Sequence, residues 1–474
     1  MITGENKKGV SGTMFTRKSL LRLAVCLAFA ITLFAFTAAP SLAYYGNEQN
    51  PANAAITKVL ALGQETPTPN ITFTFQIEKV SLDGDTSSAA LAIMPTIGNA
   101  SGNPNIGTIT ISFSSNDTYP SLMHSKRESQ TDYLPKESQQ TLFPYNTLWP
   151  RAGVYLYKVT EAQTTNYYLA DPNRETLTLS KAQYYINAVV TDRTPPVYGY
   201  YVWGIAAYHA LDDEGASVQQ GNKIDCTPGG NQQFPYNTRY SQMIFNNKYL
   251  RHGSTQPPVN PGTDIKLKIS KSISGLASSI SQYFNFDVTI KKPIISTKTS
   301  YRVYVFEGTS STPLSYSQIM QNVNNQTILN YAGYIDMPIG VPVRFMLKHN
   351  QYLAFTNIDA GATYTVNELA TTNYTPSYTL TKGGVFAGNQ TGTTGSSLNT
   401  PSAPPVTVTI SPTNSWNDTV AFNNKFIEID LGIAVDDMPY LVIIAAVLAI
   451  LGGYLFFKAR GQRISDFRFF SHRG

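Results

Sequence analysis

Two stretches of the sequence repeat one pattern. Residues 157–167 are Tyr-Lys-Val-Thr-Glu-Ala-Gln-Thr-Thr-Asn-Tyr, and residues 364–374 are Tyr-Thr-Val-Asn-Glu-Leu-Ala-Thr-Thr-Asn-Tyr, with seven of the eleven positions identical. Apolar and polar residues alternate in both, which predicts a β-strand with one buried face. The next position on that face is an acid, Glu161 in one copy and Glu368 in the other. A carboxyl group aimed at a core is costly unless it is protonated or paired, so each glutamate needs a partner.

One potential partner lies downstream of each glutamate. The motif Phe-Asn-Asn-Lys followed by an aromatic residue occurs at 245–249 and again at 422–426. Alternation places the second asparagine of each motif, Asn247 and Asn424, on the face that carries the aromatic residues.

The other potential partner lies upstream. Lys58 shares a strand face with Ile56 and Leu60, and Lys271 occupies the same position in a strand that runs through Ile269 and Ile273. Each half of the chain therefore contains an inward lysine, glutamate and asparagine in that order.

Composition favours β structure and gives no indication of a cofactor. The chain has 474 residues, enough for two to four domains, with only 14% charged residues but 30 tyrosines and 23 phenylalanines. The net charge of +5 comes largely from the two ends, so it does not predict nucleic-acid binding. The five histidines are scattered without ligand spacing, so we expect no metal. A nucleophile elbow, an HExxH motif and a Gly-rich phosphate loop are all missing, which argues against an enzyme acting on an external substrate.

The N-terminus is predicted to be a secretion signal. Arg17, Lys18 and Arg22 precede an apolar run, and cleavage is expected after Ala43, so the signal comprises residues 1–43. Cys226 is then the remaining cysteine, and no intramolecular disulfide is expected.

The mature chain divides into two copies of one all-β plan. The first domain is predicted at 54–249, with long insertions at 94–107 and 114–150, and a Pro-rich linker follows at 250–263. The second domain is predicted at 264–427 and includes a Gly/Thr/Ser/Pro loop at 383–404.

The C-terminus is predicted to enter a membrane. Residues 438–457 carry no charge and are long enough for a transmembrane helix. Acidic residues precede this segment and the basic tail 458–474 follows it, so residues 44–437 should face outward.

The ordered lysine, Tyr-x-Val-x-Glu and Phe-x-Asn strands resemble the immunoglobulin-like Cna B-type β-sandwich domains of Gram-positive surface proteins. The whole layout is similar to that of streptococcal-type backbone pilins. In that family, a lysine and an asparagine form an intramolecular isopeptide bond with the help of a glutamate. The resemblance implies Lys58–Asn247 assisted by Glu161, and Lys271–Asn424 assisted by Glu368.

The residue types suit this chemistry. Burial favours a neutral amine, which is a nucleophile, and a protonated carboxyl that can donate a hydrogen bond to an amide. The alternative is that these lysines and asparagines are ordinary exposed strand residues, as most are. Two aligned copies on the apolar face favour the first interpretation. The resemblance then implies a structural pilin or stalk subunit at the cell surface, with other pilin subunits as partners.

The region 428–437 departs from the pilin sorting signal. The family carries Glu/Gln-Val-Pro-Thr-Gly, whereas this chain has Glu-Ile-Asp-Leu-Gly at 428–432. Either a divergent sortase cleaves between Leu431 and Gly432, or the protein stays on its membrane helix. An anchored adhesin that binds a host or microbial ligand through its insertions, 94–150 or 383–404, is the alternative function.

Overall fold

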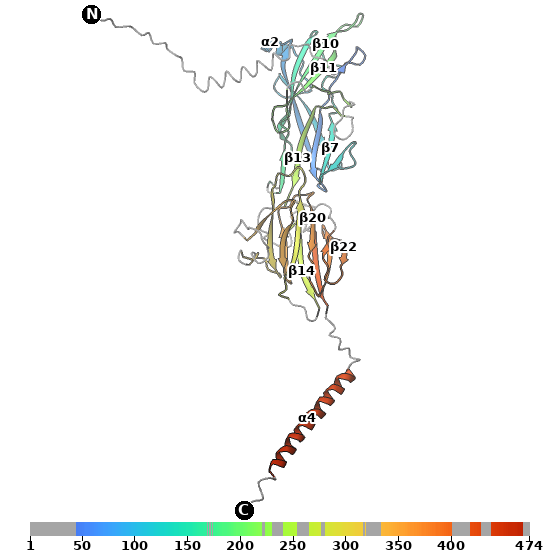
Figure 1. Cartoon of the computed structure of the whole chain (residues 1–474). Coiled ribbons are helices and arrows are strands. Elements are labelled where there is room, and N and C mark those ends of the chain that lie inside the picture. Colours follow the sequence, from blue (N-terminus) through green and yellow to red (C-terminus); the bar gives the residue numbers. More distant parts are fainter. Residues whose placement is uncertain are drawn as a thin grey trace, which may run out of the picture.

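The computed structural model describes residues 44–427 and 438–467, apart from 168, 170, 171, 173, 220–222, 230–239, 254–264, 276–279, 316, 317, 319–332 and 401–417. Two β-sandwich domains follow each other end to end along the molecule (Figure 1). The predicted signal at 1–43 and the sorting-like region 428–437 lie outside the described residues.

The first domain consists of two facing sheets. One sheet has the order β1-β11-β10-β8-β3-β5-β4, with β12 beside β11, and the other has the order β6-β7-β2-β13-β9. The strands are β1 Tyr44–Tyr45, β2 Thr57–Gly63, β3 Ile71–Leu82, β4 Asn99–Ala100, β5 Ile106–Phe113, β6 Lys126–Glu128, β7 Thr131–Glu137, β8 Gly153–Thr165, β9 Glu175–Thr178, β10 Gln183–Asp192, β11 Tyr200–Leu211, β12 Lys223–Ile224 and β13 Ile244–Arg251. A short helix, α2 (Ser88–Ile93), is capped by the Ser87 side chain.

The second domain repeats this plan with seven and four strands. Its sheets have the orders β17-β16-β19-β14-β24-β21-β22 and β18-β15-β20-β23. The strands are β14 Leu267–Ser274, β15 Phe284–Lys291, β16 Ser300–Glu307, β17 Ile335–Pro338, β18 Val343–Leu347, β19 Gln351–Phe355, β20 Thr363–Glu368, β21 Tyr374–Lys382, β22 Val385–Thr391, β23 Leu398–Asn399 and β24 Asp418–Phe426.

Alternating side chains build both cores. In β3 and β15 every second residue is buried, as period two requires when one face packs on a core. Aromatic rings from the two sheets meet there: the Phe75 and Phe245 centroids are 4.9 Å apart, and those of Phe286 and Phe422 are 5.1 Å apart. The predicted all-β fold is confirmed.

In each domain the first long strand and the last strand are parallel neighbours. β2 pairs with β13 in the first domain, and β14 pairs with β24 in the second. Because a parallel pair needs a long connection between its strands, most of each domain lies between these two strands in sequence.

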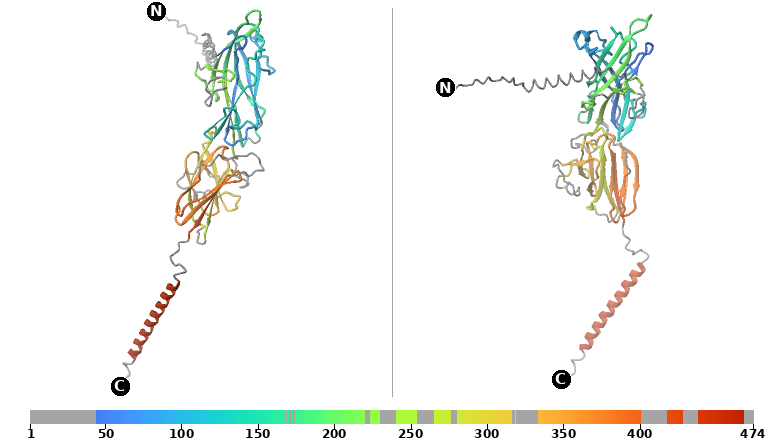
Figure 2. Two further views of the ribbon diagram at one scale, coloured as in Figure 1. Left: turned by 90° about the vertical axis from the view of Figure 1, so that its right-hand side faces the viewer. Right: turned by 45° about the horizontal axis from the view of Figure 1, so that its top comes forward.

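The two domains meet end to end at a joint (Figure 2). Main-chain hydrogen bonds cross this joint. The Gly253 N–H donates to the Ile358 carbonyl at 3.0 Å, and the Ala360 N–H donates to the Arg251 carbonyl at 2.8 Å. β13 ends at Arg251, two residues into the predicted linker at 250–263. The chain directly after it stays hydrogen-bonded to the second domain through Gly253. A small apolar cluster covers the joint, formed by Ala61, Leu250 and Ile295 with Tyr133 packed against it.

Asp359 holds the second domain's side of this joint in place. Its fully buried carboxylate accepts hydrogen bonds from the Ser296 hydroxyl at 2.5 Å and the Tyr301 hydroxyl at 2.9 Å. The Lys298 ammonium lies 2.6 Å from the other oxygen and also donates to the Asn357 carbonyl. A buried charge with three donors fixes the loop that contacts residues 251–253.

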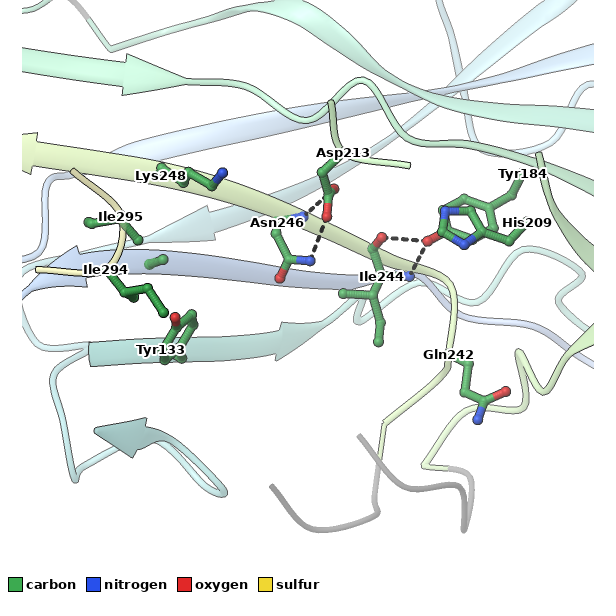
Figure 3. Close-up of a pocket in the computed structure, with 11 residues that line it drawn as sticks. Tyr133, Tyr184, His209, Asp213, Gln242, Ile244, Asn246, Lys248, Ile294 and Ile295 are labelled. Atoms are coloured by element: carbon green, nitrogen blue, oxygen red, sulfur yellow. Dashed lines mark hydrogen bonds between the residues drawn. The ribbon is translucent and has the colours of Figure 1, made fainter. Parts of the chain in front are cut away.

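A cavity of about 540 Å³ opens on the outer face of β13 beside the joint (Figure 3). Residues of both domains line it, including Lys248 of the first and Ile294 of the second. His209 and Asp213, from β11 and the loop after it, close another side.

Parts of the predicted insertions are ordinary strands. β7 lies inside 114–150 yet pairs with the whole of β2, and β22 and β23 lie inside 383–404. β7 was missed because Pro135 and the charged ends obscure its alternation. The first domain also begins earlier than residue 54, since β1 pairs with β11 and Ala52 is buried in the core.

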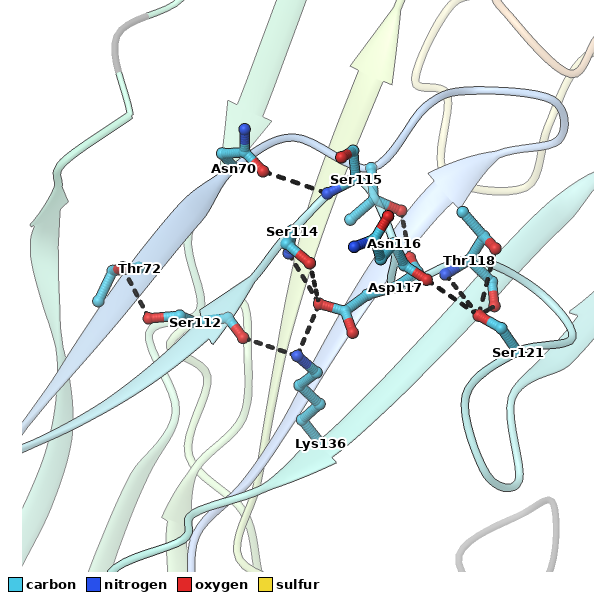
Figure 4. A network of polar contacts seen from close by, with 11 residues as sticks. Asn70, Thr72, Ser112, Ser114, Ser115, Asn116, Asp117, Thr118, Ser121 and Lys136 are labelled. Carbon is cyan, nitrogen blue, oxygen red and sulfur yellow. Dashed lines mark hydrogen bonds and ion pairs between the residues drawn. The ribbon is translucent and has the colours of Figure 1, made fainter.

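A polar network ties the loop after β5 to β7 (Figure 4). The Lys136 ammonium lies 2.6 Å from an Asp117 oxygen that also accepts the Ser114 N–H at 2.7 Å. Lys136 further donates to the Ser112 carbonyl at 2.9 Å. Because β5 and β7 belong to different sheets, this network closes one edge of the sandwich.

The C-terminal helix α4 spans Met438–Phe467. Within it, Val442–Arg460 is long and apolar enough to cross a membrane, and this stretch overlaps the predicted segment 438–457.

Removing the Asp359 carboxylate should destabilise the second domain. Asp359→Ala leaves three donors without their acceptor, and we expect the free energy of unfolding to fall by about 3 kcal/mol. Pulse proteolysis of residues 44–427 across a denaturant series, with fragments assigned by mass, measures this for each domain. As a control, Asp287→Ala breaks an ion pair with the partly exposed Arg344 and should cost less than about 1 kcal/mol. Equal losses in the two variants would contradict the role of Asp359.

Candidate functional site: a buried lysine, glutamate and asparagine in each domain

The first site lies between the two sheets of the first domain. Lys58 on β2 and Asn247 on β13 come from neighbouring strands, and Glu161 on β8 faces them from the other sheet. The parallel register pairs Lys58 with Phe245, so Asn247 follows two residues along on the same face. The three residues are 0%, 4% and 0% exposed for lysine, glutamate and asparagine.

Glu161 bridges the other two side chains. The Lys58 ammonium lies 2.7 Å from Oε2 of Glu161, and the Asn247 Nδ2 donates to Oε1 at 2.6 Å. The Asn247 Oδ1 accepts a hydrogen bond from the Ser180 backbone N–H at 2.7 Å. Every polar group of the site therefore has a protein partner, as buried polar groups require.

Aromatic rings surround the amine. The Lys58 Nζ lies 4.5 Å from the centroid of Phe73 and 5.9 Å from that of Phe75, both on β3. These rings exclude water while their faces favour a cation, so the ammonium depends on Glu161 and the rings rather than on solvent.

The second domain contains the same arrangement. Lys271 on β14 and Asn424 on β24 are neighbours, and Glu368 on β20 faces them. The Lys271 Nζ lies 2.8 Å from Oε1 of Glu368, and the Asn424 Nδ2 donates to the same oxygen at 2.8 Å. Here Phe284 and Phe286 take the places of the two rings, at 4.2 and 5.8 Å from Nζ. The structure thus brings together all six residues singled out in the sequence, in two groups of three.

The two sites differ in the hydrogen bonds of the asparagine and the glutamate. Among the described residues, the Asn424 Oδ1 and the Glu368 Oε2 are buried without a hydrogen-bond partner. The corresponding Asn247 Oδ1 has the Ser180 N–H.

Burial moves the pKa values of the lysine and the glutamate in each site toward each other. It lowers the pKa of Lys58 to about 8 against the opposing pull of Glu161, and it likewise lowers the pKa of Lys271 to about 8. Burial raises the pKa of both Glu161 and Glu368 above the usual range, although the neighbouring lysine opposes this. A neutral amine beside a protonated carboxyl is therefore much closer in energy to the ion pair than it would be in water.

Such a site contains the groups that acyl transfer requires. The amine is a nucleophile, the asparagine amide is an acyl donor, and the carboxyl that contacts both can move protons between them. The geometry holds the groups together without a bound substrate, which replaces a bimolecular encounter. Among the residues that the structure describes, no group of three potential metal ligands occurs.

Ser180 and Asp213 also belong to the first site, and sequence reasoning missed both. Ser180 follows β9, and Asp213 follows β11. Neither lies in a repeated motif, so only the folded structure brings Ser180 to Asn247 and Asp213 to Ser180 and Asn246. Cys226 is buried with its thiol pKa raised to about 12, mainly by burial, which makes it unreactive. Leu431 and Gly432 lie outside the described residues.

A family model described as a domain of unknown function (DUF7601) matches residues 265–400, within the second domain. No match to a curated protein was found.

Among solved structures, the chain is similar to the major pilin from Streptococcus pyogenes, with 18% identity over 80% of this chain and 100% of that one and a TM-score of 0.28. It is also similar to the T3.2 major pilin of the same species, with 18% identity, 79% and 99% coverage and a TM-score of 0.26. A pilus-presented adhesin, Cpa, matches at 16% identity over 41% of this chain and 32% of that one, with a TM-score of 0.19. These neighbours are pilus proteins, the kind that the sequence resembles.

Proposed function

We propose that each domain closes an isopeptide bond between its buried lysine and asparagine, and that the chain is a structural pilin or stalk subunit at the cell surface. The observation that carries this proposal is the bridging glutamate, whose carboxyl group lies within 2.8 Å of both the lysine Nζ and the asparagine Nδ2 in each domain. A buried ion pair alone would not require the glutamate carboxyl to contact an asparagine as well as the lysine.

The reaction needs only groups that are already in contact. The glutamate takes a proton from the ammonium, the free amine attacks the amide carbon, and the carboxyl gives its proton to the amide nitrogen. The glutamate then takes a second proton from the lysine nitrogen, the bond to the amide nitrogen breaks, and ammonia leaves. The domain is both catalyst and substrate, and it turns over once. No cofactor is required.

The proposed bond would stabilise the domain as a disulfide does, by closing a long loop of the chain. In the chain-entropy model, closing a loop as long as the one between Lys58 and Asn247 contributes about 5 kcal/mol. Because the bond joins the first long strand to the last strand, a pull on the two ends of a domain would pass through a covalent link. This suits a surface fibre, and α4 suits its anchoring to the membrane.

The bonds should be visible as lost mass. We expect residues 44–427 to lack one ammonia per domain, with branched tryptic peptides that join Lys58 to Asn247 and Lys271 to Asn424. Glu161→Ala should leave the first domain unlinked and the second linked, and Glu368→Ala should do the reverse, since each acid contacts only its own lysine. The unlinked domain should lose about 5 kcal/mol of unfolding free energy.

Intact-mass and peptide mass spectrometry, with denaturant midpoints, measure these effects. Glu78→Ala is a matched control, because Glu78 pairs with Lys158 at the surface of β3 and should leave both bonds intact. A wild-type mass equal to that of the sequence would refute the bond in both domains.

The rate of bond formation should show a bell-shaped dependence on pH. The reactive state, neutral amine with protonated carboxyl, carries one shared proton. The rate should therefore fall below the raised pKa of Glu161, where both groups are protonated, and again above the lysine pKa of about 8, where neither is. Unlinked chain can be recovered from inclusion bodies in denaturant, and its uncorrected mass confirms that it is unlinked. It is then diluted into buffers of different pH and its ammonia loss is followed. Fluorescence at each pH checks that folding is faster than linking. A rate that keeps rising from pH of about 8 to about 10 would contradict the glutamate's role as proton donor.

The form of anchoring determines the mature C-terminus. We expect surface attachment through the C-terminal region, with the ectodomain outside. Mass spectrometry of chains from wall and membrane fractions distinguishes two routes. A chain that ends at Leu431, with ladders on denaturing gels, indicates sortase processing and polymerisation, and one that retains residues 458–474 indicates membrane retention. A chain found only in the medium, which neither ends at Leu431 nor retains residues 458–474, would contradict surface attachment.

A further inference from the structure

The amide of Asn247 is held in one orientation by a backbone donor. The Ser180 N–H lies 2.7 Å from the Asn247 Oδ1, and because an N–H group only donates, it must face the oxygen. This leaves Nδ2 toward Glu161, the group that would protonate it. Ser180 can reach Asn247 because pairing between β9 and β13 ends at Thr178, which faces Lys248, and the chain then turns across the end of the site.

Ser180 is itself held by its other polar groups. Its hydroxyl donates to Asp213 Oδ1 at 2.5 Å and accepts the Ala182 N–H at 3.0 Å. Its carbonyl accepts a hydrogen bond from the Gln163 side chain at 2.8 Å.

Asp213 also contacts β13, the strand that carries Asn247. Its two oxygens accept the Asn246 N–H at 2.9 Å and the Asn246 Nδ2 at 2.6 Å (Figure 3). Asn246 directly precedes Asn247, so one carboxylate fixes both the donor, Ser180, and the residue that carries the acceptor.

We infer that the Ser180 N–H is the oxyanion donor for bond formation in the first domain, and that Asp213 is the residue that positions it. This inference rests on the proposed isopeptide reaction. As the Lys58 nitrogen bonds to the Asn247 amide carbon, the carbonyl electron pair moves onto Oδ1, where the N–H receives the charge. Glu161 gives its proton to Nδ2 and takes one from the Lys58 nitrogen. The bond to Nδ2 then breaks, ammonia leaves, and the carbonyl reforms.

The second domain offers no equivalent donor among its described residues. Asn424 faces Pro376 on β21, and proline has no N–H. β21 stays paired with β24 as far as Thr381, so the chain does not turn across the site as it does after β9. The Asn424 Oδ1 accordingly lacks a partner among those residues. The second domain is therefore an internal control within the same chain.

The test compares the linking rates of the two domains in residues 44–427. Unlinked chain is diluted from denaturant, samples are quenched over time, and branched peptides from each domain are measured. Asp213→Ala should slow the first domain roughly tenfold or more and leave the second unchanged. Asp213→Asn keeps an oxygen that can accept the hydrogen bond from the Ser180 hydroxyl, so it should restore most of the rate. Glu214→Ala, at an exposed neighbour paired with Lys248, is the matched control and should have no effect.

The Asp213 charge acts in the same direction on both reacting groups. It raises the pKa of Lys58 and the pKa of Glu161, so its removal lowers both and leaves the balance between the neutral pair and the ion pair nearly unchanged. Slowing therefore reports lost positioning. Ser180→Ala, which removes only the hydroxyl that Asp213 holds, should also slow the first domain and is a milder change if Asp213→Ala folds poorly.

Unchanged rates in Asp213→Ala and Ser180→Ala, with Glu161→Ala still blocking the bond, would overturn the inference and leave the proposed function standing. A wild-type chain in which neither domain links would overturn both.

Discussion

An ammonium group enclosed by phenylalanine rings persists in a protein only while a carboxylate stays in contact with it. Both domains contain this arrangement, with no solvent exposure of the lysine or glutamate side chain. The cost of separating such a pair is several kcal/mol, because each charge would be left in a medium that cannot solvate it. A one-residue slip of β2 or β8 would turn the lysine or the glutamate to the opposite face. The pair therefore specifies the alignment of the two sheets as strongly as the apolar residues around it do.

Much of this was predictable, because most of the strands that carry the two sites alternate, as β13, β14 and β24 do. β2 is buried at every position, so its own pattern does not single out Lys58. The repeat in the second half, where Lys271 lies on an alternating strand, supplies that evidence. The supporting residues were not predictable in this way. Ser180 and Asp213 act from loops after β9 and β11, and loops carry no periodicity. β7 was missed for a related reason, since its pairing with β2 decides its structure more than its own composition does.

The two domains share a site but differ in how they support it. In the first, a short β9 lets the chain cross the end of the site and supply a backbone N–H. In the second, the longer β21 occupies that edge and places a proline there. The length of one neighbouring strand thus determines whether the asparagine carbonyl meets a donor, although the three central residues are the same.

The parallel pairing of the first long strand with the last has a geometric consequence. Since β2 and β13 run in the same direction, the chain enters the first domain at one end of the sandwich and leaves at the opposite end. β14 and β24 do the same in the second. An antiparallel pair would return the chain to the end where it began, and successive domains would fold back on each other. With this topology the reach of the molecule grows by nearly a full domain length with each repeat, so height above a surface becomes a simple function of domain number.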